Sequence, residues 1–246
     1  MACMKAVLLG RCPSAQLVDI SHEIPPQDTL AGAFSLSAAF PWFPPATVFL
    51  CVVDPGVGTA RPLIAAKADG RYLVGPDNGL LSLALQQAKT RQVVRLTSRR
   101  FWLPKLSGTF HGRDILAPVA AHLAAGVPLG RLGTTTRRIQ AVPIPTPRQS
   151  GRRISGCVVH VDRFGNLITN LSSSLLTRRG RMHICFGRRP ARVVSSYAQG
   201  RSGELIALAG STGYLELAVR DGSAAQRLSA QRGDEVTSTI SLIRPA

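Results

Sequence analysis

The chain has 246 residues, of which 45% are hydrophobic and 17% charged, and its formal net charge at pH 7 is +17. This length suits one large domain or two smaller ones, and it excludes a disulfide-stabilised miniprotein and a disordered tail. No apolar run approaches the roughly 18 residues that a membrane helix needs. Residues 1–10 lack the parts of an export signal. We therefore expect a soluble, cytoplasmic protein without membrane contact.

The cysteines are scattered and show no CxxC spacing. They are Cys3, Cys12, Cys51, Cys157 and Cys185. An odd number argues against a complete disulfide framework, and reduced core thiols are typical of the cytoplasm.

Arginine carries nearly all of the positive charge, because the only lysines are Lys5, Lys67, Lys89 and Lys105. A pI near 11.3 is typical of nucleic-acid-binding proteins. The arginines, however, are spread along the chain in pairs, and only 5% of the residues are aromatic, which leaves few platforms for stacking single-stranded bases. We therefore keep nucleic-acid binding as a minor hypothesis and favour an arginine-rich surface.

The first half of the chain alternates short apolar runs with helical patterns, which predicts an α/β domain with a mostly parallel sheet. Its first elements are a strand at 15–20 and a helix over 29–40 with Asp28 as the N-cap. The continuous β-branched run 47–53 predicts a strand that is buried on both faces.

A hairpin follows, because Asp69-Gly70 is a standard tight-turn signal between two strand patterns. The predicted elements from here to the end of the first half are strands at 62–68 and 71–75, a helix over 80–89, a strand at 92–97 and a helix over 113–125. They complete a first domain of residues 1–140.

Residues 141–150 are the best linker candidate, with prolines at 143, 145 and 147. Beyond them, residues 151–246 contain short β-type runs separated by Gly, Ser and Asp, which predict a small β-barrel or sandwich. The runs are 156–161, 167–171, 182–186, 191–195, 204–209, 214–220 and 235–241. The chain is therefore expected to be α/β followed by all-β.

Asp54 ends the apolar run 47–53 and begins the glycine turn Asp-Pro-Gly-Val-Gly. Ligands of open α/β sheets bind at the carboxyl ends of strands. Arg61 is close enough along the chain to fold back, pair with Asp54 and hold it ionised. The alternative is an aspartate that ends a strand and bonds its own turn. Local sequence does not separate the two.

A second candidate lies at the start of the last helix of the first half, where His111 and Asp114 stand at a predicted helix mouth. Helix N-termini favour anionic partners, and a histidine can orient or exchange a proton near neutral pH. The alternative is that Asp114 caps the helix and His111 is incidental. The loop 76–79, Pro-Asp-Asn-Gly, is more typical of ordinary turn and cap chemistry.

In the second half, the loop after residue 161 is unusually polar for a connection between strands. Asp162 can accept a hydrogen bond from an ammonium group, and Asn166 can donate to and accept from a heterocycle. The segment 211–214 is typical of a hairpin turn. The sequence has no HExxH, Walker A or GxGxxG motif and no clustered Cys and His, so neither a metal nor a nicotinamide cofactor is expected.

Six segments, taken together and in order, resemble the S-adenosyl-L-methionine hydroxide adenosyltransferases. These SAM hydrolases are relatives of the fluorinating and chlorinating enzymes. The segments are 21–28 (SHEIPPQD), 53–58 (VDPGVG) with Arg61, 75–81 (GPDNGLL), 109–114 (TFHGRD), 162–170 (DRFGNLITN) and 210–216 (GSTGYLE). The resemblance implies a homotrimer whose subunits have an α/β domain and a β-barrel, with active sites shared between neighbouring subunits. It also implies hydrolysis of S-adenosylmethionine to adenosine and methionine by attack of water or hydroxide on the ribose C5′.

The resemblance assigns residues to this reaction. The family's catalytic set falls on Asp54, Arg61 and His111. Its substrate contacts fall on Asp162 (methionine ammonium), Asn166 (adenine), Ser211 (methionine carboxylate) and the backbone of Val219 (adenine edge). S-adenosylmethionine is the substrate, and no cofactor or metal is implied.

Comparison with the halogenating relatives favours water as the nucleophile. Those enzymes have a tyrosine where His111 stands, and the fluorinating enzyme has a serine in place of Gly112. The segment 59–76 also lacks the fluorinating enzyme's long insertion.

One family feature is missing from this resemblance. Family members begin with a strand and loop of the type Thr-Asp-Phe-Gly, well before the point that matches Met4-Lys5. We expect either a start codon placed too late or a truncated relative that binds adenosyl compounds, or forms trimers, with impaired catalysis.

Overall fold

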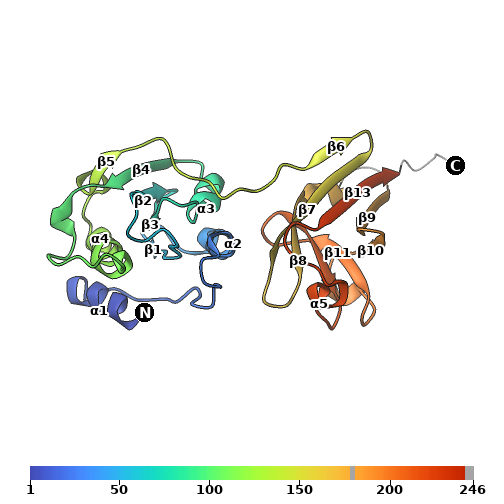
Figure 1. The fold of residues 1–246 in the computed structure, drawn as a ribbon, viewed down its shortest axis with the longest axis horizontal. Coiled ribbons are helices and arrows are strands. Elements are labelled where there is room, and N and C mark those ends of the chain that lie inside the picture. Colours follow the sequence, from blue (N-terminus) through green and yellow to red (C-terminus); the bar gives the residue numbers. More distant parts are fainter. Residues whose placement is uncertain (178–180, 242–246) are drawn as a thin grey trace. The chain divides into compact units, whose positions relative to one another are not determined.

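A computed structural model describes residues 1–177 and 181–241 (Figure 1). The chain divides into two compact units, Met1–Val142 and Pro143–Ala246. The domain boundaries at 1–140, 141–150 and 151–246 stay a prediction.

The first unit is built on a mixed sheet, which in the described residues has the strand order β1-β3-β2-β4-β5. The strands are β1 (Val48–Leu50), β2 (Leu63–Ala68), β3 (Arg71–Pro76), β4 (Arg91–Leu96) and β5 (Gly133–Thr135). Within this sheet only β1 and β3 run parallel, and the other pairs are antiparallel. The prediction of a mostly parallel sheet is therefore wrong.

One of the antiparallel pairs, β2–β3, is the hairpin that the sequence predicts. Asp69 and Gly70 have φ values of 45° and 80°, the left-handed backbone of a tight two-residue turn. Such a turn joins only antiparallel strands, whereas parallel neighbours need a crossover.

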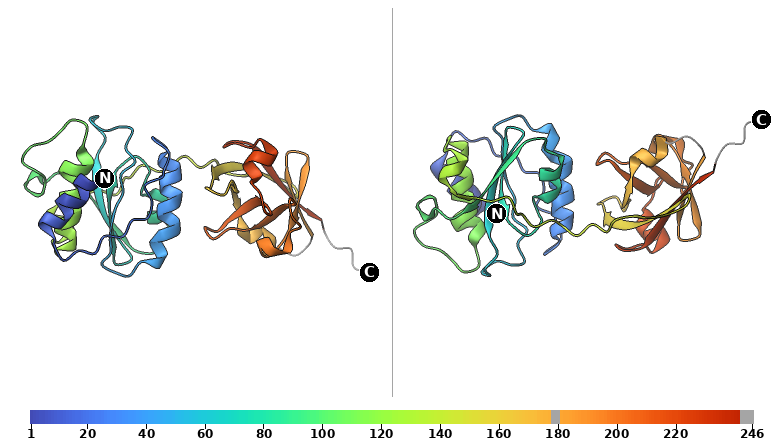
Figure 2. Two further views of the ribbon diagram at one scale, coloured as in Figure 1. Left: turned by 90° about the horizontal axis from the view of Figure 1, so that it is seen from below. Right: turned by 90° about the horizontal axis from the view of Figure 1, so that it is seen from above.

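Helices cover both faces of this sheet (Figure 2). They are α1 (Ala2–Arg11), α2 (Thr29–Ala39), α3 (Ser82–Gln87), a π-helical turn (Gly112–Leu116) and α4 (Ala117–Ala124). Side chains of successive strand residues point to opposite faces. In β3, Val74 accordingly packs in the α4 core and Leu73 in the α2–α3 core.

Helix α2 begins as predicted, because the Asp28 side chain accepts a hydrogen bond from the Ala31 N–H at 3.0 Å. Helix α1 has no counterpart among the predicted elements. Each of its residues keeps some exposure, and it lies against α4.

The predicted strand at 15–20 is wrong. That segment has no strand assignment and is mostly exposed, and β1 covers only part of the run 47–53. A strand forms only where neighbouring backbones satisfy its N–H and C=O groups. Among the described strands β1 pairs with β3 alone, so its other edge has no strand partner.

The second unit is a closed β-barrel. This agrees with the all-β prediction and decides between its two alternatives, the barrel and the sandwich, in favour of the barrel. Its seven described strands are β7 (Arg153–Val161), β8 (Leu167–Ser172), β9 (Arg181–Phe186), β10 (Arg189–Val193), β11 (Leu205–Ala209), β12 (Tyr214–Val219) and β13 (Glu235–Ser241). Strand β13 pairs with both β9 and β7, which closes the barrel. The short β6 (Arg148–Ser150) adds to β7, and helix α5 (Ala224–Leu228) follows β12.

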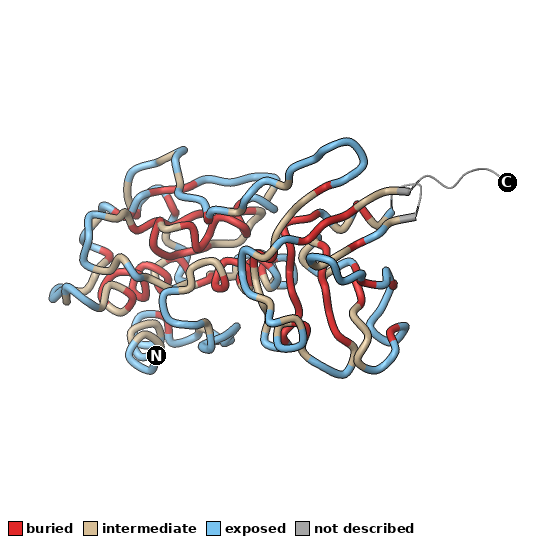
Figure 3. The backbone as a smooth tube through the Cα atoms, turned by 45° about the vertical axis from the view of Figure 1, so that its right-hand side comes forward, coloured by how far each residue is buried: buried red, intermediate tan, exposed pale blue. Residues whose placement is uncertain are grey.

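Buried residues concentrate along the strands and in helices α2, α3 and α4 (Figure 3). Inside the barrel, Leu215, Leu217 and Val219 of β12 pack with residues of the facing strands. Each unit therefore has a hydrophobic core of its own.

Candidate functional site

Asp54 and Arg61 form an ion pair at the end of the extended segment that continues β1. The Arg61 guanidinium donates through Nε to Asp54 Oδ1 and through Nη2 to Oδ2, so that it grips both carboxylate oxygens. The two side chains are only 10% (Arg61) and 6% (Asp54) exposed. Bidentate pairs of this kind are stronger and more directional than single contacts.

A glycine turn makes this pairing possible. A Cβ on Gly56 would lie 3.0 Å from Arg61 Cδ, so the glycine leaves room for Arg61 to fold back over the turn. Thr59 closes the turn, because its N–H and its hydroxyl both donate to the Gly56 carbonyl, at 3.1 and 2.7 Å. The contact between Asp54 and Arg61 that the sequence suggested is present.

A second loop brings His111 to this pair. Gly58 has a φ of +83°, and a Cβ there would lie 2.8 Å from the Gly108 carbonyl oxygen, so the two loops touch backbone to backbone. His111 Nδ1 lies 3.5 Å from Arg61 Nη1 and 3.4 Å from Nη2. The structure therefore places all three predicted catalytic residues in one cluster.

The Arg61 guanidinium also determines which nitrogen of the His111 imidazole carries the proton. A guanidinium only donates hydrogen bonds, so the His111 Nδ1 that faces it is an acceptor. In the neutral ring the proton then lies on Nε2, which is left to donate to a bound molecule.

Asp114 is not part of this cluster. Its fully buried carboxylate accepts hydrogen bonds from the Ser107 N–H at 2.7 Å and from Arg113 Nε at 2.5 Å. The Arg113 hydrogen bond, more than any other contact, lowers the pKa of Asp114. Asp114 therefore anchors the loop before His111 and does not cap the helix.

The loop 76–79 makes hydrogen bonds that support the backbone next to Asp54. Asn78 donates to the Val53 carbonyl at 2.8 Å, and Asp77, buried, accepts from the Gln140 N–H at 2.7 Å. These are structural contacts, in line with the turn chemistry that the sequence favours.

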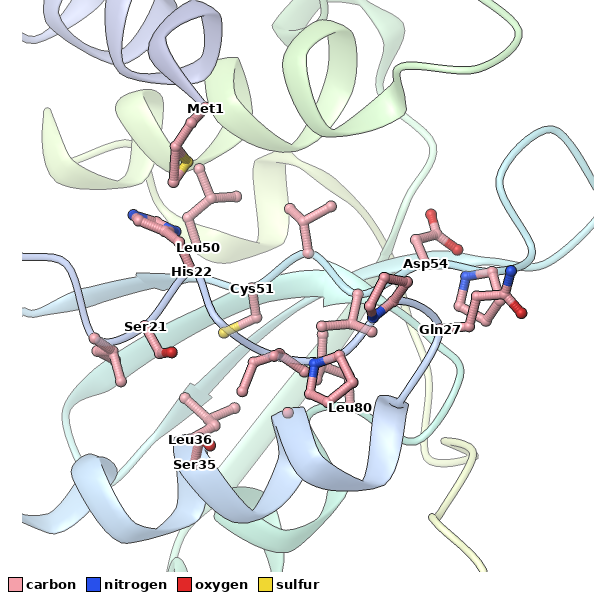
Figure 4. A pocket seen from close by; sticks show the side chains of 18 of the residues that line it. Met1, Ser21, His22, Gln27, Ser35, Leu36, Leu50, Cys51, Asp54 and Leu80 are labelled. Carbon is pink, nitrogen blue, oxygen red and sulfur yellow. The ribbon is translucent and has the colours of Figure 1, made fainter. Parts of the chain in front are cut away.

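A pocket of about 710 Å³ reaches the cluster, and Asp54 lies at one end of it (Figure 4). Its walls are mostly apolar, with Leu36, Leu50 and Cys51 among them. Burial raises the pKa of the Cys51 thiol to about 12, so this cysteine is neutral and unreactive at neutral pH.

Several polar side chains of this pocket belong to residues 21–28. This is the first of the six segments that carry the family resemblance, and no role was assigned to its residues. Ser21, His22 and Gln27 line it together with Asp54 (Figure 4). The segment has no strand assignment, and it turns at residues 26–27, where Gln27 has a φ of 66°.

In the barrel unit, Asp162 and Asn166 lie in the turn between β7 and β8. Asp162 Oδ1 accepts from the Phe164 N–H at 2.9 Å and from the Asn166 N–H at 2.8 Å, and Oδ2 accepts from Asn166 Nδ2 at 3.1 Å. The turn therefore fixes both predicted substrate contacts relative to each other.

Ser211 and Val219 lie at opposite ends of β12. Ser211 is exposed in the turn 210–213, which the hydrogen bond from Gly213 N–H to the Gly210 carbonyl closes at 3.1 Å. Val219 is buried at the other end and forms a bridge with Gly222. Register places Asn166 toward the Val219 end, since Leu167 pairs with Leu217.

One buried acid in this unit received no role from the sequence. Glu216 is only 8% exposed in the middle of β12, and its carboxylate accepts a hydrogen bond from the Tyr197 hydroxyl. The available signal was a glutamate within the strand pattern Tyr-Leu-Glu-Leu-Ala-Val.

Within residues 1–177 and 181–241, no three His, Cys, Asp or Glu side chains come together as metal ligands would. In the same ranges no helix is long and apolar enough to cross a membrane. The cysteines Cys3, Cys12, Cys51, Cys157 and Cys185 are all free thiols.

These two units and their sequences define the class of protein. Residues 1–133 match the SAM hydroxide adenosyltransferase N-terminal domain, and residues 156–237 match the C-terminal domain of the same family. The chain belongs to the SAM hydroxide adenosyltransferase family.

Individual relatives cover nearly the whole chain. It is 40% identical to the (R)-S-adenosyl-L-methionine hydrolase of Salinispora tropica, covering 97% of this chain and 92% of that protein. The hydrolase of the same name from Thermus thermophilus is 39% identical, with coverages of 95% and 91%. Proteins named fluorinase match at lower identity.

Solved structures agree with the fold. An uncharacterized conserved protein from Thermotoga maritima superposes with a TM-score of 0.86 at 36% identity, covering 97% of this chain and 94% of that one.

Proposed function

We propose that this protein hydrolyses S-adenosyl-L-methionine to adenosine and L-methionine. The observation that carries the proposal is the cluster of Asp54, Arg61 and His111, whose Asp54 lines a mostly apolar pocket. The relatives named (R)-S-adenosyl-L-methionine hydrolase, at up to 40% identity over 97% of the chain, support it.

The reaction depends on an aligned nucleophile, and it needs no general acid to protonate the leaving group. A water oxygen forms a bond to the ribose C5′ while the C5′–S bond breaks, and the bonding electrons leave with sulfur as a neutral thioether. Because the leaving group is neutral, no proton has to be supplied to it. The site's task is to position one water molecule in line and to accept its proton.

The three residues divide this task. Asp54 accepts a hydrogen bond from the water and takes its proton, while Arg61 holds the carboxylate in one orientation. The Nε2–H of His111 donates to the water oxygen and aims its lone pair at C5′. A water molecule in bulk solvent lacks both constraints.

The barrel unit supplies the substrate contacts in this proposal. Asp162 binds the methionine ammonium, Ser211 the methionine carboxylate, Asn166 the adenine and the Val219 backbone the adenine edge. Neither a metal nor an organic cofactor takes part.

The proposal also includes the homotrimer that the family resemblance implies, with each active site shared by two subunits. We further propose that the protein acts in the cytoplasm, which the free cysteines support.

The test is to incubate the purified chain with S-adenosylmethionine and to measure adenosine by chromatography. We expect adenosine and methionine in equal amounts, and a loss of at least about 100-fold in rate for Asp54→Asn. Asp69→Asn, which changes a half-buried carboxylate in the β2–β3 turn, is the matched control and keeps the wild-type rate.

One outcome would overturn the proposal. Wild-type protein that forms no more adenosine than Asp54→Asn is not a hydrolase. If it then still binds S-adenosylmethionine in calorimetry, it is a non-catalytic adenosyl-binding relative.

A further inference from the structure

Glu216 is a buried carboxylate that the proposed reaction leaves unused. On β12, Leu215 and Leu217 point into the barrel core, so Glu216 between them points to the outer face. There its backbone lies between Ile168 of β8 and Leu208 of β11. Ala218, on the same outer face, packs in a separate small apolar cluster with Leu208.

One hydrogen bond and one close approach of the backbone define the surroundings of this carboxylate. The Tyr197 hydroxyl donates to Oε1. The other oxygen, Oε2, lies 3.1 Å from the place where a Cβ on Gly210 would be, so the glycine lets the turn 210–213 lie directly on the carboxylate. That turn carries Ser211.

The charges around Glu216 are unfavourable in the free protein. Burial and the Asp162 carboxylate raise the pKa of Glu216, and the hydrogen bond from Tyr197 opposes them in part. No salt bridge joins Glu216 to an arginine or lysine of the described residues, although the whole chain has 30 Lys and Arg against 13 Asp and Glu. A buried charge without a cation is costly, so this place favours a positive ligand group.

We propose that Glu216 is a positioning residue for the amino-acid end of the substrate. Its carboxylate lies against the turn that carries Ser211, and its negative charge adds to that of Asp162. The α-ammonium of S-adenosylmethionine then binds beside the two carboxylates. This inference rests on the proposed function, and it assigns Tyr197 the role of holding Glu216.

The pH dependence has a defined sign. Glu216 loses its charge at a higher pH than an ordinary glutamate, so KM should begin to rise on acidification before other carboxylates titrate. A carboxyl group with a raised folded pKa contributes stability at low pH and loses it as the pH rises through that pKa. Removing the charge should therefore not destabilise the ligand-free protein at pH 7.

The experiment compares the full chain with Glu216→Gln, Tyr197→Phe and a control, Glu235→Gln, whose side chain is 58% exposed on the same barrel. For Glu216→Gln we expect KM to rise about tenfold, kcat to stay within about twofold, and the melting temperature at pH 7 not to fall. Tyr197→Phe should move the acid rise in KM to higher pH. The control should match the wild type.

A second measurement separates charge recognition from a general structural defect. L-methionine and its analogue without the amino group, 4-(methylthio)butanoate, are compared as inhibitors of each variant. Glu216→Gln should weaken inhibition by methionine only. A wild-type KM for Glu216→Gln, or equal weakening of both inhibitors, overturns the inference.

Failure of the inference and failure of the proposed function have different signatures. If the wild-type chain forms no adenosine, the function fails, and calorimetric binding of S-adenosylmethionine to the same variants still tests Glu216. Should Glu216→Gln not fold, Tyr197→Phe decides, because that side chain is 47% exposed and its ring is kept. An unshifted KM profile for it overturns the inference.

Discussion

Arg61 organises the candidate active site at the scale of single residues. It donates to both oxygens of Asp54 and also faces His111 Nδ1. One planar guanidinium thereby sets the orientation of the carboxylate and the tautomer of the imidazole. A lysine would supply the charge without the fork that makes both contacts.

Two amide substitutions of His111 test the prediction that its imidazole donates through Nε2. In His111→Gln the side-chain nitrogen reaches the position of Nε2, whereas in His111→Asn it reaches only that of Nδ1. Because the proposed mechanism uses Nε2–H to orient water, we expect Gln to retain about ten times more kcat than Asn. Steady-state kinetics of both variants measure this, and equal rates would contradict the tautomer assignment.

Asp114 stabilises the fold through the Arg113 and Ser107 contacts. For Asp114→Asn we expect a loss of about 2–3 kcal/mol in the free energy of unfolding at pH 7. A lowered carboxyl pKa contributes stability above the unfolded value, near 3.8, and loses it as the pH falls through the folded pKa. The difference from wild type should therefore shrink below about pH 4.

Urea unfolding at pH 7 and pH 3 checks this prediction. Asp221→Asn, at an exposed carboxylate that lies 3.6 Å from its arginine partner, is the control and should change little at either pH. A difference for Asp114→Asn that stays constant with pH would rule out the charge as the cause.

At the scale of elements, two loops make the site, and glycines let them approach. Gly56 leaves room for Arg61, and Gly58 lies against the Gly108 carbonyl. The strands and helices on either side only bring these loops to the same edge. The position of His111 relative to Asp54 therefore depends in part on this backbone contact between Gly58 and Gly108.

Gly58→Ala tests that contact, and Gly126→Ala is its control. Both glycines have left-handed φ values, +83° and +87°, but a Cβ on Gly126 would meet nothing within 4 Å. Both variants should lose about 1 kcal/mol of stability from the backbone strain. Only Gly58→Ala should also lose at least about tenfold in kcat, because its loops must separate.

Chemical denaturation and kinetics of the two variants provide the comparison. Equal kcat values in Gly58→Ala and Gly126→Ala would show that the distance between the loops has no effect on the reaction.

At the scale of the whole molecule, the net charge of +17 belongs to a chain whose two units each have a hydrophobic core of their own. Arginines of both units contribute, and several are engaged within the fold: Arg61, Arg71, Arg113, Arg192 and Arg220 each donate hydrogen bonds to other protein groups. The arginines are spread along the chain, and part of their charge is used within the fold.

Dispersed charge predicts weak, salt-sensitive binding to DNA. We expect retention of duplex DNA at low salt that is lost near physiological salt. Fluorescence anisotropy across a salt series measures it. Tight binding that persists at physiological salt would favour the nucleic-acid hypothesis instead.

Much of the fold and part of the site were open to prediction from local sequence. The Asp28 cap, the Asp69-Gly70 hairpin and the seven barrel strands rest on short-range patterns, which act within a few residues of the chain. Asp54 and Arg61 are seven positions apart around a glycine turn, so their pairing was also within reach.

Other features depend on what lies beside a segment in space. The segment 15–20 has a strand-like sequence but no strand partner among the described strands. The direction of each strand depends on its neighbours in the sheet, which include the β2–β3 hairpin. The hydrogen bond that Glu216 accepts comes from Tyr197, which lies 19 positions away in the chain.

The sequence by itself determined which segments form the barrel strands and the main helices, which family the chain resembles, and which residues are candidates for catalysis. Only the tertiary structure decided the mixed sheet, the unpaired edge of β1, the meeting of His111 with Arg61, and the burial of Glu216 under the Ser211 turn. The physical reason is that propensity and turn chemistry are local, whereas pairing, burial and charge environment are set by residues far apart in the chain.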